Sequence, residues 1–340
     1  MLRFSLQRLA SGLLTALVVV TATFFVIRLV PGDPATAMAP PNATPAQIER
    51  IRDYLGLTEP LVNQYALYLQ RLADLDFGTS IRTGQPVLSD LLARVPASIE
   101  LAAVALLLQV VVAIPVGIIA AVRRGSRVDY LSRLASSVIV GLPVFWVGLM
   151  FLWIFAFHLQ LFPLGGRLDL QTRLEPVTGF YVIDAFLRGR PGVALEAIHH
   201  LILPALALAL PSIAFWARLM RGSLLEVLGA DHVRTARAKG LTQRQVVVRH
   251  GVRNALNPMV TVIGLELVGL LTAAILVEII FSWPGIGNYI FSSLQVRDYP
   301  VVQGTVILIA LLYVLMNSLV DIVQARLDPR ILASLQRASP

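Results

Sequence analysis

The sequence predicts an all-α, polytopic membrane protein with six transmembrane helices. The chain of 340 residues has a mean hydropathy of +0.75. It is 56% hydrophobic and 14% charged, whereas soluble domains contain about 45–50% apolar and about 25% charged residues. Six apolar stretches are each long enough for a helix that crosses a bilayer, since a hydrocarbon core of ~30 Å requires about 20 apolar residues.

The six predicted spans are distributed along the whole chain. They cover residues 9–30, 97–122, 134–158, 198–219, 257–281 and 301–323. The first is expected to remain as an uncleaved helix, because its apolar stretch exceeds the roughly 7–15 residues of a secretory signal sequence. The predicted parts are a first segment and span (1–30), an external helical segment (31–95), a transmembrane domain (96–325) and a tail (326–340). The predicted connecting segments within the domain are a basic segment (about 221–256) and outer loops (about 159–197 and 282–300).

The distribution of basic residues predicts the orientation. The segments 1–8, 123–133, 218–256 and 324–340 hold 17 Arg and Lys in 75 positions. The segments that alternate with them, and are therefore predicted on the opposite side of the membrane, hold 10 in 123 positions. Cytoplasmic loops carry an excess of Arg and Lys. Both termini and the basic segment are therefore expected on the cytoplasmic side.

The external segment 31–95 is too long for a simple connection and predicts two short helices, at 45–56 and 60–75. Thr44 and Pro45 are suited to the N-cap and the first position of the first helix. Two interpretations stay open: a small external domain that meets another protein, and a cap that packs against this chain's own spans.

The basic segment predicts a short helix, a tight turn and a longer helix. Asp231 is expected to be the N-cap of the short helix, and Gly240 suits the left-handed position that ends it. Thr242 and Gln245 form a T-x-x-Q capping box that opens the longer helix. A helix of about eight residues with a small apolar face is marginal by itself, so we expect it to dock on a partner.

The basic segment has three possible partners: nucleic acid, the lipid surface and a cytoplasmic protein subunit. Nucleic acid is a poor candidate partner for a loop between spans. The lipid surface explains the positive charge but not the order of the residues. A protein subunit best explains a defined helix–turn–helix. The chain has no Walker A motif, because its single lysine, Lys239, is followed by Gly240 rather than Ser or Thr.

Several motifs, in order along nearly the whole chain, resemble one family. These are VPGDP (30–34), LGLTEPLVNQYALYL (55–69), LDFGTSIRTGQPV (75–87), IPVG (114–117), VTGFYVIDAF (177–186), RTARAKGL (234–241) and IFSWPGIGNYIFSSLQVRDYPVVQG (280–304). They resemble the inner-membrane permeases of the dipeptide and oligopeptide branch of ATP-binding-cassette importers. In the general importer motif the glycine is preceded by Glu-Ala-Ala, whereas Arg234, Thr235 and Ala236 stand here, as in the peptide branch. This departure leaves open whether Arg234 does what a Glu would do.

The resemblance implies a type I importer fold in the bacterial inner membrane and a set of partners. These are a second homologous permease, one or two cytoplasmic ATP-binding subunits that hold ATP and Mg, and a periplasmic or lipid-anchored binding protein, together with membrane lipid but no nucleic acid. The implied substrates are dipeptides or short peptides, with glutathione, a nickel complex or haem as alternatives. The chain itself is expected to have no catalytic activity.

Three groups of site residues are expected. Those for ATPase coupling are Glu226, Asp231, Arg234, Thr235, Ala236, Lys239, Gly240 and Leu241. Those for the translocation path are Glu266, Asn257, Thr261, Thr272, Pro204 and Pro211. Glu266 lies within a span, where a charge costs roughly 2.5–3.5 kcal/mol, so it lines a path or is paired inside the protein. Candidate contacts for a binding protein are Asp53, Tyr65, Arg82 and Asp298.

Other site classes find no support in the sequence. There is no Cys, and the five His have no metal-ligand spacing; adjacent His199 and His200 point to different faces of a helix, so no metal site is expected. An ion-coupled secondary transporter predicts paired ionisable residues at mid-membrane and internal repeats. An intramembrane enzyme predicts a catalytic set within the spans. Neither pattern is evident.

Overall fold

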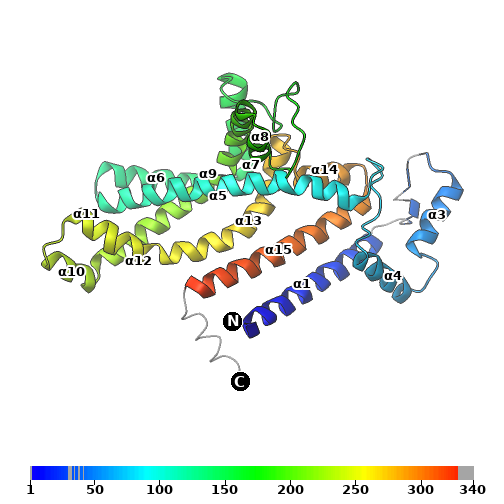
Figure 1. Ribbon diagram of the computed structural model, residues 1–340, viewed down its shortest axis with the longest axis horizontal. Helices are drawn as coiled ribbons and strands as arrows, with labels where there is room; N and C mark the ends of the chain where they lie inside the picture. Colours follow the sequence, from blue (N-terminus) through cyan, green and yellow to red (C-terminus); the bar gives the residue numbers. More distant parts are fainter. Residues whose placement is uncertain (1, 30–32, 34, 37–38, 41, 328–340) are drawn as a thin grey trace. The chain divides into compact units, whose positions relative to one another are not determined.

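The computed structural model describes residues 2–327 apart from 30–32, 34, 37–38 and 41 (Figure 1). The described residues are helical, with one isolated β-bridge between Thr79 and Pro86. They fall into two compact units. The first unit contains residues up to Pro96 and Pro284–Ile322, and the second contains Ala97–Trp283. The predicted all-α class is confirmed for the described residues, and most of the expected tail lies outside them.

The first unit is built from helices at the two ends of the chain. They are α1 (Leu2–Leu29), α3 (Pro45–Leu55), α4 (Leu61–Ala73), the start of α5 (Val87–Val122), α14 (Ile286–Gln295) and most of α15 (Tyr299–Leu327). The two short helices predicted after the first span are present as α3 and α4. Thr44 caps α3 in a reciprocal capping box with Gln47, and Pro45 occupies the first turn.

Helix α4 packs against α1. The hydroxyl groups of Tyr65 and Thr21 lie 2.6 Å apart, and the ring of Phe24 contacts the rings of Tyr65 and Tyr68 at centroid distances of 5.1 and 5.3 Å. Phe24 is completely buried. This packing agrees with the second interpretation of the external segment, a cap on the chain's own spans, and both interpretations stay predictions.

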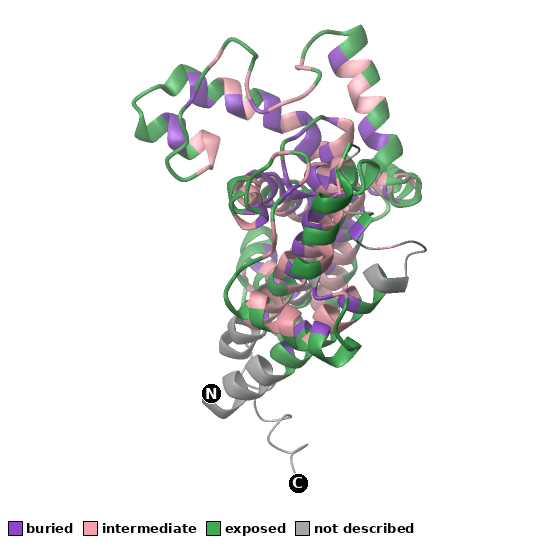
Figure 2. Ribbon diagram, turned by 90° about the vertical axis from the view of Figure 1, so that its right-hand side faces the viewer, coloured by how far each residue is buried: buried purple, intermediate pink, exposed green. Residues whose placement is uncertain are grey.

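The second unit is organised around the long helix α9. Its elements are the rest of α5, α6 (Arg127–Val140), α7 (Val144–Phe151), the π-helical segment η1 (Leu152–His158), α8 (Tyr181–Leu187), α9 (Pro191–Gly229), α10 (Asp231–Ala238), α11 (Gln243–Gln245), the π-helical segment η2 (Val246–Val252), α12 (Arg253–Ala255) and α13 (Asn257–Ile280). Helix α9 packs against α6, α7, α8 and α13. Buried and exposed positions alternate along the helices (Figure 2), and the buried face of α9 includes the fully buried Trp216 and Met220.

Helix α9 is continuous over 39 residues although it contains two prolines, Pro204 and Pro211. A proline removes one backbone donor and crowds the preceding turn. Neighbouring helices can support such positions in a membrane protein, and Pro204 is buried among them. The two prolines therefore do not divide α9 into separate helices.

The six predicted spans are only partly matched. Among the described residues, three helices are long and apolar enough to cross a membrane: Val87–Val122, Pro191–Gly229 and Tyr299–Val320. Two bent pairs raise the number to five, and Ser11–Val26 is a shorter apolar helix. The span predicted at 134–158 is not one continuous helix, because Arg127–Val140 and Val144–His158 meet at 105°. The break falls at Gly141–Pro143, where Pro143 cannot donate a helical hydrogen bond. Helix α5 also begins ten residues earlier than the span predicted at 97–122.

Candidate functional site

The basic segment leaves the end of α9 through an abrupt change of backbone direction. Ala230 is extended, with ψ 152°, and α10 begins at Asp231. The prediction that Asp231 is the N-cap is wrong: Ala230 occupies that position, and no side chain caps the helix. Asp231 lies in the first turn, where its negative charge is favourable near the helix N-terminus. Its carboxylate is exposed and accepts from Arg234 at 3.2 Å.

Gly240 ends α10 as predicted. Its φ is +83°, a left-handed conformation that favours glycine. The N–H of Gly240 donates to Arg237 at 2.9 Å and the N–H of Leu241 donates to Ala236 at 3.4 Å. This pair of bonds is the Schellman pattern, which satisfies carbonyls at the end of a helix.

The second part of the basic segment is also defined by its cap. The N–H of Gln245 donates to Thr242 Oγ1 at 3.4 Å, and the N–H of Thr242 donates to Gln245 Oε1 at 2.9 Å, which confirms the predicted capping box. The longer helix consists of α11, η2, α12 and α13 in succession. Its π-helical part was not predicted, because the apolar spacing of 246–252 does not distinguish a π-helical turn from an α-helical one.

Helix α10 is anchored to its own chain by a small apolar cluster. Val233 is completely buried and Ala236 is 5% exposed, and both pack with Val246. Val227, Leu228 and Leu241 surround this cluster. All other residues of α10, and Lys239 and Gly240 after it, are exposed. One face of α10 is thus fixed to α9 and η2, and the opposite face is polar, charged and open to a partner.

The expected coupling residues fall into two groups, those in the anchoring cluster and those that are exposed. Ala236 and Leu241 belong to the anchoring cluster. Asp231, Arg234, Thr235, Lys239 and Gly240 are exposed, and Glu226 is exposed near the end of α9. The structure therefore brings these residues together at one end of α9 (Figure 1).

The same end of α9 is in close contact with η2 and α12. A methyl group at Gly251 would lie 2.9 Å from Leu224 Cδ1 and 3.3 Å from Leu228 Cδ2. Ser223 Oγ donates to the carbonyl of Ala255 at 3.0 Å. These contacts connect α10 to α9 directly and to α13 through η2 and α12.

A buried ion pair joins α9 to α6. The Arg221 guanidinium donates to both oxygens of Asp129 at 2.6 and 2.9 Å, and the N–H of Gly125 donates to the same carboxylate at 3.0 Å. The Asp129 side chain is 2% exposed. Bidentate pairs of this kind fix geometry as well as charge, so α6 and α9 are expected to move together here.

The predicted path residues are not gathered into one site. Glu266 on α13 is half-buried and accepts a hydrogen bond from Ser212, which is next to Pro211 on α9. Asn257 and Thr272 are exposed, Pro204 is buried, and the side chain of Thr261 lies outside the described part. Glu266 is thus paired inside the second unit, and the path role of these residues stays a prediction.

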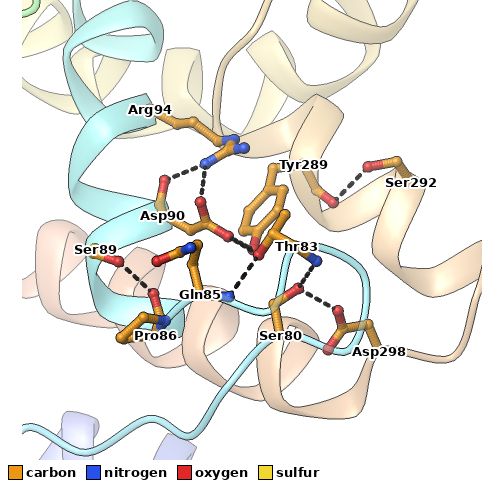
Figure 3. A network of polar contacts seen from close by, with 10 residues as sticks. All are labelled: Ser80, Thr83, Gln85, Pro86, Ser89, Asp90, Arg94, Tyr289, Ser292 and Asp298. Atoms are coloured by element: carbon orange, nitrogen blue, oxygen red, sulfur yellow. Dashed lines mark hydrogen bonds and ion pairs between the residues drawn. The ribbon is translucent and has the colours of Figure 1, made fainter. Parts of the chain in front are cut away.

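The predicted docking residues lie in the first unit with different exposures. Asp53 and Arg82 are exposed. Tyr65 is half-buried against α1, and Asp298 is completely buried. Asp298 accepts from Ser80 Oγ at 2.7 Å (Figure 3) and from the N–H of Arg82 at 3.2 Å. Asp298 therefore offers no surface for docking, and the expectation for this residue is wrong.

The loop that Asp298 supports belongs to a larger polar network in the first unit. The Tyr289 hydroxyl donates to Asp90 at 2.7 Å, and Arg94 pairs with Asp90 at 3.0 Å (Figure 3). Burial, with the hydrogen bond to Asp90, raises the pKa of Tyr289 to about 12. Tyr289 is therefore a neutral hydrogen-bond donor at physiological pH.

A cavity of about 550 Å³ lies in the first unit beside this network. Its lining includes Tyr54, Tyr68, Arg71 and Asp76, and Pro300 from α15. The Arg71 guanidinium stacks on the Tyr54 ring at 3.8 Å from its centroid. This cavity was not predicted, because its walls come from parts of the chain more than 200 positions apart.

Two buried acidic groups organise the 159–197 loop, and no sequence pattern predicted either of them. The Glu100 carboxylate on α5 pairs with Arg167 and accepts from the N–H of Val182 at 3.1 Å. Asp184 is completely buried and accepts from the N–H groups of Val177, Thr178 and Gly179. Burial by itself raises the pKa of Asp184, but the hydrogen bonds from Thr178 and these N–H groups outweigh it and lower the pKa below its usual 3.8.

Comparison with known families matches almost the entire chain. Residues 113–333 match the family described as binding-protein-dependent transport system inner membrane component. Residues 1–102 match the N-terminal part of such membrane components.

Three relatives illustrate the similarity. A dipeptide transport system permease protein of Alkalihalophilus pseudofirmus is 41% identical over 331 residues, covering 97% of this chain and 99% of the relative. A probable D,D-dipeptide transport system permease protein of Escherichia coli K12 is 45% identical over 312 residues, covering 91% of each chain. A di/tripeptide transport system permease protein of Pseudomonas aeruginosa is 42% identical over 332 residues, covering 97% and 99%.

Proposed function

The chain belongs to the family of binding-protein-dependent transport system inner membrane components, and from this premise we propose that it is the permease subunit of an ATP-binding-cassette importer of dipeptides. Its relatives over more than nine-tenths of the chain are permease proteins of dipeptide and di/tripeptide transport systems. The permease forms the membrane path, and partner subunits bind and hydrolyse ATP with Mg.

The observation that carries the proposal is the anchoring of α10. Its apolar face is fixed to α9 and η2 by Val233 and Ala236, and its other face is exposed and polar. A short helix held in this way can bind a cytoplasmic ATPase on one side and transmit displacement on the other. Alternating access of this kind is mainly rigid-body motion, and the continuous α9 is suited to it.

The full assembly follows from the same proposal. In the proposed arrangement six spans cross the membrane, and both termini and the basic segment lie in the cytoplasm. The excess of Arg and Lys in these segments supports this orientation. A second homologous permease completes the path, one or two ATPases bind the coupling helices, and a binding protein delivers substrate from outside. Glu226, Asp231, Arg234, Thr235 and Lys239 are the proposed ATPase contacts.

Reconstitution tests this function. The complete transporter in proteoliposomes should import a labelled dipeptide only with ATP and the binding protein present. Its ATPase rate should rise when the substrate-loaded binding protein is added. Uptake by this chain alone, driven by an ion gradient, would instead identify a secondary transporter.

A further inference from the structure

Three side chains in the second unit form a cluster that has no role in coupling. Glu196 and His200 lie four positions apart on α9, so they project from one face of the helix. Asp169 comes from the 159–197 loop. One possible ligand atom from each lies within 4.8 Å of the others.

The spacing within this cluster fits a metal ion. The distance between His200 Nε2 and Asp169 Oδ1 is 3.3 Å. Two ligand atoms at about 2.0–2.1 Å from a tetrahedral zinc ion lie about 3.3 Å from each other. The arrangement of the two atoms therefore leaves the room that such an ion requires.

The imidazole ring of His200 is oriented with Nε2 toward the carboxylate of Asp169. His200 Nδ1 lies 3.1 Å from the carbonyl oxygen of Gly165 and 3.2 Å from that of Gly166. A carbonyl oxygen only accepts, so Nδ1 carries the hydrogen. In the neutral ring, Nε2 is then an acceptor. Nε2 faces a carboxylate oxygen of Asp169, and this contact is completed either by a proton on Nε2, which makes an ion pair, or by a metal ion bound to both atoms.

The surroundings resemble the outer shell of a metal site. A metal-bound histidine usually donates its second N–H to a carbonyl or carboxylate, as Nδ1 does here. Both oxygens of Glu196 are also oriented: Oε1 accepts from the N–H of Asp169 at 2.8 Å, and Oε2 accepts from Thr172 Oγ1 at 3.0 Å. These bonds hold the ligand set in place before an ion arrives.

The donor set selects the ion. An imidazole nitrogen with two carboxylates suits zinc, whereas calcium and magnesium prefer oxygen ligands alone. Three protein ligands leave a fourth position for water. The His200 side chain is 3% exposed and that of Asp169 is 70% exposed, so an ion reaches the buried nitrogen from the solvent side of the loop.

We propose that Asp169, Glu196 and His200 bind one zinc ion, which ties the 159–197 loop to the beginning of α9. The ion takes the place of a proton between His200 Nε2 and Asp169 Oδ1 and forms a coordinate bond to each atom. It therefore stiffens the loop around Gly165–Thr172 without taking part in ATP hydrolysis.

Zinc titration of the complete transporter tests the proposal. The transporter is stripped with a chelator, and binding of Zn²⁺ is measured by competition with a fluorescent zinc indicator. The wild type should bind one more zinc ion per copy of this chain than H200Q. D169N and E196Q should bind it at least about ten-fold more weakly, since even outer-shell changes cost 10–100-fold. Asp169 is exposed, so D169N is expected to fold normally.

The chain offers a matched control in the neighbouring histidine. His199 is exposed, and its Nε2 lies 2.8 Å from the carbonyl oxygen of Leu161, so H199Q should bind zinc like the wild type. Zinc should also slow amide hydrogen exchange in residues 165–172 of the wild type and H199Q but not of D169N. Equal zinc binding by the wild type, H200Q and D169N would overturn the proposal. So would equal losses in H199Q and H200Q.

Discussion

Gly240 sets the direction in which the chain leaves α10. Its φ of +83° lies in the left-handed region, and a methyl group built there meets nothing within 4 Å. A larger side chain at this position is therefore opposed by backbone strain and not by crowding. For a β-branched residue the strain is of order 1–2 kcal/mol.

We predict that Gly240→Val leaves the amount of membrane-inserted protein near normal but weakens ATPase binding and transport. The strained position shifts the end of α10 and the turn into the Thr242 capping box. Gly240→Asn should be milder, because Asn tolerates the left-handed region. Co-purification of the ATPase subunits and dipeptide uptake measure both effects. A valine variant that equals the wild type in both assays would refute the coupling role of this turn.

Asp184 provides a second prediction at the residue scale, for the 159–197 loop. Asp184→Asn should weaken the hydrogen bonds from residues 177–179 and speed amide exchange there, because a hydrogen bond to a charged group contributes about 1.5–3 kcal/mol. The lowered pKa also fixes the pH dependence. The stabilisation of the loop by the Asp184 carboxylate is complete above pH 3.8, the usual pKa of an Asp. It is lost as the pH falls through the lower pKa of Asp184 in the folded state.

Hydrogen exchange between neutral and acidic pH separates these effects. The wild type should lose protection of residues 177–179 only at acidic pH, and Asp184→Asn should lack part of this protection already at neutral pH. Glu175→Gln in the same loop is the control, since the Glu175 side chain is 88% exposed. Protection that is unchanged in Asp184→Asn would contradict the role of this carboxylate.

At the scale of elements, α9 is held to its neighbours by polar contacts at the end that carries the basic segment. Arg221 and Asp129 join it to α6, and Arg218 donates to the carbonyl of Ser136 on the same helix at 3.1 Å. A buried ion pair adds little to the stability of the fold when it is compared with a well-packed apolar pair. Removal of one partner, however, leaves an unpaired buried charge, which is destabilising.

Arg221→Gln should therefore destabilise the permease by about 3–5 kcal/mol. Thermal unfolding of the purified transporter measures the loss. The double variant with Asp129→Asn should recover part of it, because the uncompensated charge is gone. Arg133→Gln is the control, since Arg133 is 53% exposed and 3.7 Å from Asp129. Equal melting temperatures for Arg221→Gln and Arg133→Gln would show that the bidentate pair stabilises the permease no more than Arg133 does.

The elements also show which parts of the structure could be predicted from the sequence. The caps at Thr44, Gly240 and Thr242 were predictable, because each depends on residues within a few positions. The bend at Gly141–Pro143 was missed, because the apolar pattern continues across it. Asp129–Arg221 and Arg167–Glu100 are separated by 92 and 67 positions. No local pattern indicates that such side chains meet.

At the scale of the whole molecule, the distribution of basic residues predicts the orientation of the chain in the membrane. The chain has no cysteine, so single cysteines report on one position each. Val62→Cys on α4 should react with an impermeant thiol reagent on spheroplasts, and Arg244→Cys in the basic segment should not. Both side chains are exposed in the structure. Permeabilised cells, in which both should react, provide the control, and the reverse pattern in spheroplasts would overturn the orientation and the coupling proposal.

The anchoring of α10 by Val233 and Ala236 has a consequence for the kinetics of assembly. The helix is already ordered in the isolated chain, so its eight residues lose little conformational entropy when an ATPase binds. Ordering the backbone of such a segment during binding would cost roughly 1–2 kcal/mol per residue. A preformed helix instead binds as a rigid body, with association rates of about 10⁵–10⁷ M⁻¹s⁻¹. With α10 as the proposed ATPase contact, we expect the ATPase subunits to dissociate and rebind without any refolding of the permease.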